Sequence, residues 1–97
     1  MAEAINDLDA LYLHIAEDRS FETADRYLAR IERLCFSLGS FPMRGTVVGG
    51  ADPGCRTIGF ERRATILFHV GVDVVEILRI LHYGRDIQPV LKRISDD

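Results

Sequence analysis

Seven side chains in the C-terminal half could act on a phosphate or carboxylate group. They are five arginines, a histidine and a tyrosine: Arg56, Arg62, Arg63, Arg79, His82, Tyr83 and Arg85. The arginine guanidinium is a planar fork of donors that matches phosphate and carboxylate oxygens. Beside arginines, a histidine and a tyrosine could cleave RNA without a metal, one activating the 2′-hydroxyl and the other protonating the leaving oxygen. In such a ribonuclease the catalytic residues would be Arg56, Arg79, His82 and Tyr83.

The same side chains also fit a purely structural role, which composition alone favours. Charged clusters are commonly solvated surface whose ion pairs add little stability. The arginines could bind carboxylates of their own strands and turns, such as Glu61, Glu76 or Asp86. Arg79, which has apolar neighbours, could pair with Glu76 or with a carboxylate of a helix.

Other chemistries have no support in the sequence. The three histidines show no metal-ligand spacing, so no metal site is expected. A GxGxxG motif and a phosphate-binding P-loop are absent, as is a nucleophile motif around the serines, so no cofactor is expected. Cys35 and Cys55 are too few for a disulfide framework and fit reduced structural thiols in a reducing cytoplasm.

Two helices are predicted to precede the arginine-rich half. Apolar residues recur in steps of three and four over residues 2–18 and again over 21–38. Ser20 is a suitable N-cap for the second helix, and Gly39 could close it in a left-handed conformation, before Pro42. The short break between the two stripes predicts an antiparallel helical hairpin.

Strands are predicted to carry the arginines. Residues 39–54 are rich in glycine and proline and indicate a loop, with a short extended piece at Thr46–Val48. Residues 55–60, 64–70 and 74–82 favour strands joined by tight turns, which predicts a three-stranded antiparallel meander. The last strand is apolar on both faces, as a central strand would be. Ile87, Val90, Leu91 and Ile94 suggest a short final helix or tail, with Pro89 near its start.

The predicted fold is therefore α+β, with the helical hairpin packed on one face of a small sheet. The 97 residues suffice for one domain, covering 1–97. No apolar run is long enough to span a membrane, and the acidic N-terminus does not fit an export signal. These features favour a cytoplasmic protein.

The charge is unevenly distributed along the chain. Residues 1–38 carry four basic and eight acidic side chains, a net charge of −4, whereas residues 39–95 carry eight basic and five acidic ones, a net charge of +3. The whole chain has a net charge of −3, which argues against a general nucleic-acid binder. A positive surface on the C-terminal half is nevertheless expected.

In the order of its elements and in several short strings, the chain resembles the ParE/RelE toxin superfamily, and the ParE branch in particular. The resemblance covers roughly residues 2–88, and the order and spacing of the strings carry it, not any single one. In chain order they are Ala2-Glu-Ala, Asp7-Leu-Asp, Ile15-Ala-Glu, Ala24-Asp-Arg-Tyr27 with Ile31, Leu38-Gly-Ser-Phe-Pro42 with Gly45, Arg56, Ile66-Leu-Phe68, and Ile77-Leu-Arg79-Ile-Leu-His82 with Arg85-Asp86.

The resemblance implies a toxin of a type II toxin–antitoxin pair, often described as a plasmid stabilisation protein. ParE-type toxins inhibit DNA gyrase, whereas RelE-type relatives cleave mRNA on the ribosome. A cognate antitoxin neutralises both by placing a helix in an apolar groove and adding a strand at a sheet edge. An acidic antitoxin tail would suit the arginine-rich half. A homodimer or a toxin–antitoxin hetero-oligomer would fit this pattern.

Two features bear on which activity the resemblance implies. RelE-type ribonucleases carry several lysines and arginines on the sheet, near a C-terminal tyrosine or histidine, but the single lysine here, Lys92, lies outside the sheet, which favours gyrase as the target. The pair His82-Tyr83 fits the ribonuclease alternative. The family usually begins with a strand that this sequence lacks before its first helix, so an unpaired sheet edge or an inactive interaction module is a third possibility.

Overall fold

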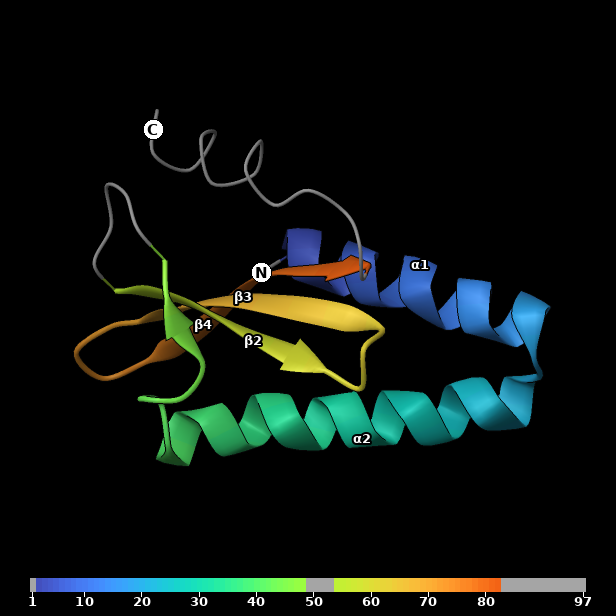
Figure 1. Cartoon of the computed structure of the whole chain (residues 1–97), viewed down its shortest axis with the longest axis horizontal. Coiled ribbons are helices and arrows are strands. Elements are labelled where there is room, and N and C mark those ends of the chain that lie inside the picture. Colours follow the sequence, from blue (N-terminus) through green and yellow to red (C-terminus); the bar gives the residue numbers. More distant parts are fainter. Residues whose placement is uncertain (1, 49–53, 83–97) are drawn as a thin grey trace.

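In the computed structural model, residues 2–48 and 54–82 are described, and they form two helices followed by a four-stranded sheet (Figure 1). The elements are α1 (Ala2–Asp18), α2 (Phe21–Ser40), β1 (Thr46–Val47), β2 (Cys55–Phe60), β3 (Ala64–Val70) and β4 (Val75–His82). The α+β prediction is confirmed. The predicted final helix lies outside the described residues, as does part of the predicted loop over residues 39–54.

The helical hairpin forms as predicted at its closed end. The Ser20 side chain caps α2 by accepting a hydrogen bond from the Thr23 backbone N–H at 3.0 Å. The Tyr12 hydroxyl donates to Asp25 at 2.7 Å and so ties α1 to α2.

The predicted closure of α2 at Gly39 is wrong. Gly39 does not take a left-handed φ, and α2 continues through it to Ser40. The helix stops instead at Phe41 (φ −131°, ψ 72°), because a proline at position 42 disfavours the helical conformation of the residue before it.

The sheet has four antiparallel strands in the order β1-β2-β3-β4, one more than the predicted three. The additional strand is the short extended piece expected near Thr46, whose Cα is paired with that of Thr57 in β2. Gly45 makes this pairing possible. Its φ is +74°, and a Cβ there would lie 2.1 Å from the carbonyl oxygen of Thr57.

The prediction that the last strand is central is also wrong, because β4 lies at an edge of the described sheet. Its apolar pattern has another cause: Ile77 and Ile80 join the main core, whereas Leu78 and Leu81 join a second cluster with Leu67. Its outer edge is partly covered by α1, since the backbone N–H of Ile80 donates to the Asp7 carboxylate at 2.9 Å.

The main core lies between both helices and one face of the sheet. Its fully buried side chains come from α1, α2 and β3 and include Ile15, Ile31, Leu38, Ile66 and Phe68. In Figure 1 the helices are joined at one end and separate toward the other, with strands crossing the space between them. This core fixes both helices on the sheet and leaves the open end of the hairpin to form a surface.

Candidate functional site

Arg79 is committed to a structural contact. Its Nε and Nη2 donate to the two carboxylate oxygens of Asp7 at 2.6 and 3.0 Å, and the two side chains are only 12% and 13% exposed. The hydrogen bond that Arg79 donates to Asp7 raises the pKa of the Arg79 guanidinium. The Asp7 carboxylate therefore accepts hydrogen bonds both from a largely buried arginine and from the Ile80 N–H. These bonds join α1 to β4. The predicted alternative, a helix carboxylate as partner of Arg79, is confirmed.

Arg63 belongs to a second cluster, around the turn between β2 and β3. The guanidinium of Arg63 lies 6.0 Å from the ring centroid of Tyr27, and that of Arg30 lies 5.6 Å from it. Arg30 also donates to both carboxylate oxygens of Glu61, at 2.7 and 2.8 Å. The hydrogen bond from Arg30 lowers the pKa of Glu61. These contacts hold the turn against α2.

The turn between β2 and β3 also carries Arg62, which precedes Arg63 and lies on the surface. Glu61 and Arg62 have positive φ values of 50° and 56°, a backbone conformation that residues other than glycine rarely adopt. Arg62 is exposed. The anchored turn therefore presents one arginine to solvent in a defined position.

The remaining candidates lie in other surroundings. Arg56 on β2 donates from Nε to the carbonyl oxygen of Arg44 at 3.0 Å. The ring of His82, at the end of β4, meets the ring of His14 edge-on with centroids 5.0 Å apart. Tyr83 and Arg85 lie outside the described residues. The structure thus does not gather the five described candidates into one site: Arg62 and Arg63 share the β2–β3 turn, Arg79 and His82 contact α1 from β4, and Arg56 bonds to Arg44. Their roles in binding or catalysis stay predictions.

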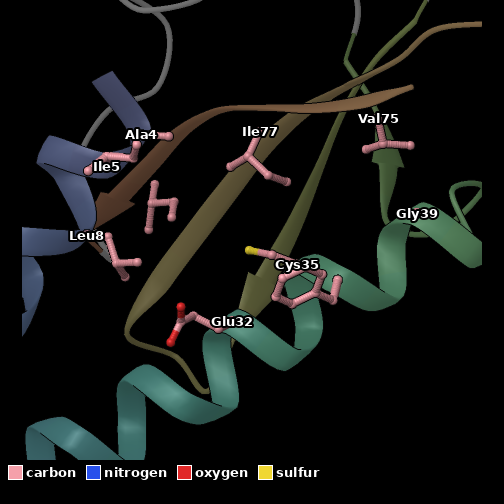
Figure 2. Close-up of a pocket in the computed structure, with 10 residues that line it drawn as sticks. Ala4, Ile5, Leu8, Glu32, Cys35, Gly39, Val75 and Ile77 are labelled. Atoms are coloured by element: carbon pink, nitrogen blue, oxygen red, sulfur yellow. The ribbon is translucent and has the colours of Figure 1, made fainter. Parts of the chain in front are cut away.

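A groove lies at the open end of the helical hairpin, with a volume of about 420 Å³. Figure 2 shows side chains of α1, α2 and β4 around it. Its apolar lining comes from Ala4, Ile5, Leu8, Cys35, Phe36, Gly39, Val75, Ile77 and Ile80, and Glu32 is the one charged residue that lines it. We refer to this feature as the hairpin groove.

Apolar side chains remain exposed along the hairpin groove. Phe36 on α2 is 83% exposed and Ile5 on α1 is 61% exposed. Exposed apolar groups gathered beside a cavity mark binding surfaces more often than single ones do. Sequence reasoning placed Ile5 on the apolar stripe of the first helix and did not single out Phe36, because periodicity shows which face of a helix is apolar but not where a covering element ends.

The hairpin groove has an acidic character. Between Ala2 and Asp18, α1 carries five acidic residues and no lysine or arginine: Glu3, Asp7, Asp9, Glu17 and Asp18. Glu32 extends from α2 beside Cys35 (Figure 2). Burial, and secondarily the charge of Glu32, raise the pKa of the Cys35 thiol. Cys35 is therefore a partly accessible thiol within the groove, and its surroundings disfavour the thiolate form.

Residues 2–48 and 54–82 contain neither a candidate metal cluster nor a candidate membrane-spanning helix. Within these ranges no three His, Cys, Asp or Glu side chains are grouped as metal ligands would be. Neither α1 nor α2 is long and apolar enough to cross a bilayer.

Comparison with known proteins identifies the family. Residues 1–87 match the model of the ParE toxin of the type II toxin–antitoxin system parDE. The chain belongs to this family. A solved structure described as a chromosomal ParDE toxin–antitoxin system from P. aeruginosa is similar to it, with 28% identity and a TM-score of 0.73 over 87% of this chain and 91% of that one. The search of curated proteins gave no match.

Proposed function

We propose that this ParE-family chain is the toxin of a type II toxin–antitoxin pair and that it inhibits DNA gyrase in the cytoplasm. The family match over residues 1–87 carries the proposal. Two features support gyrase over mRNA as the target. The sequence has no lysine between residues 55 and 82, and Arg79, which a ribonuclease would need free, is held by Asp7.

The hairpin groove is the surface that best fits the proposed antitoxin. A helix-in-groove contact needs an apolar depression flanked by packed elements, and the groove between α1, α2 and β4 has that form. An antitoxin seated there would cover Phe36 and Ile5, which are otherwise exposed to water.

Expression in bacteria tests the proposal against its alternatives. A gyrase inhibitor arrests growth and leaves cleaved chromosomal DNA with intact mRNA, and co-expression of a cognate antitoxin restores growth. A RelE-type ribonuclease instead cleaves mRNA on ribosomes, and His82→Ala would reduce that cleavage. An inactive relative permits normal growth, which would contradict the toxin proposal.

A further inference from the structure

Glu32 is the acidic residue that lines the hairpin groove, and it is exposed to solvent. Elsewhere the carboxylates that join described elements are each held by a donor: Asp7 by Arg79, Asp25 by Tyr12 and Glu61 by Arg30. Glu32 forms no ion pair or hydrogen bond with any residue in the described ranges. It lies among apolar groove residues, beside Leu8 and Cys35 (Figure 2).

A partner that covered this groove with apolar groups alone would remove water from the Glu32 carboxylate without replacing its hydrogen bonds. Burying an unpaired charge is strongly unfavourable, whereas a lysine or arginine at that point supplies both donors and opposite charge. On the neighbouring α1, Glu3 lies next to the groove residue Ala4 and adds a second negative charge, whereas Asp7 is paired with Arg79, so the local field also favours a cation.

We propose that the hairpin groove binds an amphipathic helix whose apolar face carries a single lysine or arginine placed against Glu32, and that Glu32 selects this partner by charge. The proposal deepens the proposed function, because it rests on an antitoxin as the partner. It differs from the sequence-based expectation of an acidic antitoxin segment. An acidic stretch would suit the arginine-bearing turn at Arg62, but not this groove.

A second copy of the chain is a poor occupant. Closed dimers mostly use the same surface on both subunits, so a two-fold contact across the groove would bring Glu32 near its own copy. The copy's α1 would add further negative charge. Like-charge juxtaposition of this kind disfavours association, so a basic segment of another protein is the better match.

Selection from a displayed peptide library tests the proposal without a known antitoxin. The library consists of 16-residue helices with leucines in i, i+3, i+4 and i+7 spacing and one randomised position within the apolar face. It is selected against the full chain, against Glu32→Lys and against Glu17→Lys. The last variant makes the same charge change on α1 at an exposed position outside the groove lining. Circular dichroism checks that all three proteins are folded.

The proposal expects lysine or arginine at the randomised position for the parent and for Glu17→Lys, and aspartate or glutamate for Glu32→Lys. Synthetic peptides with Lys and Glu at that position should differ in affinity for the parent by about tenfold, and in the opposite sense for Glu32→Lys. Bound peptide should also slow alkylation of Cys35, which lines the groove, while Cys55 is buried.

Three results would overturn the proposal: no enrichment at all, the same enriched residues for the parent and Glu32→Lys, or selected peptides that leave Cys35 alkylation unchanged. If Glu32→Lys is unfolded, Glu32→Gln replaces it, and the expected tenfold preference for the Lys peptide should then disappear. The gyrase and growth measurements use the chain alone. A chain that arrests growth but shows no charge selection overturns this proposal only, whereas charge selection by a non-toxic chain overturns only the proposed toxicity.

Discussion

Single residues decide how the helices are fixed to the sheet. Asp7 accepts from the Arg79 guanidinium twice and from the Ile80 backbone once, although it lies more than seventy residues from both. The sequence could indicate that Arg79, with its apolar neighbours, needs a carboxylate. It could not single out Asp7 among the acidic residues of α1, because helical periodicity does not fix how a helix lies against a strand.

Asp7→Ala should therefore be among the most destabilising single substitutions on the surface of α1. It leaves a half-buried guanidinium and the Ile80 N–H without their acceptor, which should lower the free energy of unfolding by about 3 kcal/mol. Urea denaturation measures the loss. Asp9→Ala, an exposed carboxylate two residues away, is the control and should change stability by less than about 0.5 kcal/mol. Equal losses for the two variants would contradict the role of Asp7.

Removing the hydroxyl of Tyr27 should not lower the free energy of unfolding, in contrast to the loss of the Asp7 carboxylate. Its hydroxyl is buried and has no hydrogen-bond partner among the described residues, whereas its ring packs edge-on against Phe60 and lies near the guanidinium groups of Arg30 and Arg63. Tyr27→Phe keeps the ring and removes the unsatisfied hydroxyl. The free energy of unfolding at pH 7 should stay constant or rise by about 1 kcal/mol. A decrease of more than about 1 kcal/mol in the free energy of unfolding would show that the hydroxyl makes a stabilising hydrogen bond.

The same residue predicts an alkaline pH dependence. Burial raises the pKa of Tyr27 to about 12 in the folded chain, from 10.0 in the unfolded chain. Between pH 10 and 12 the unfolded chain releases this proton and the folded chain keeps it, so ionisation favours unfolding and stability falls through this range. Tyr27→Phe should lose less stability there than the parent. Identical pH profiles from thermal melts would contradict the burial of this hydroxyl.

At the scale of elements, helix periodicity and strand composition predicted the existence and order of α1, α2, β2, β3 and β4 well. The errors arose where a non-local contact decides. The short β1 is a strand only because β2 pairs with it, and β4 is an edge strand whose second apolar face packs in a separate cluster. Neither fact is encoded in the two-residue periodicity of a single strand.

Substitutions of two glycines distinguish the effect of a non-local contact from the effect of local helix propensity. Gly45→Ala should destabilise the fold by more than about 1 kcal/mol, because its φ is positive and the new Cβ would collide with the Thr57 carbonyl. Gly39→Ala is the matched substitution: the site is helical with nothing within 4 Å of the new Cβ, so it should stabilise by about 0.5–1 kcal/mol. Thermal melts that ranked the two variants in the reverse order would contradict the placement of β1.

On the scale of the whole molecule, the fold separates two surfaces of different chemistry. The hairpin groove is apolar and acidic, whereas the turn at Glu61–Arg63 presents arginine to solvent. The charge difference between the two halves of the sequence anticipated this separation. The groove itself was not predicted, because it forms where α1 and α2 diverge over β4, and that divergence is a property of packing in three dimensions.

A gyrase supercoiling assay tests the central claim most directly. Purified chain is added to gyrase, ATP and relaxed plasmid, and the products are separated on a gel. The account predicts that micromolar chain blocks supercoiling or traps linear, gyrase-cleaved plasmid, and that a cognate antitoxin abolishes the effect. Unchanged supercoiling and no linear product at that concentration would contradict it.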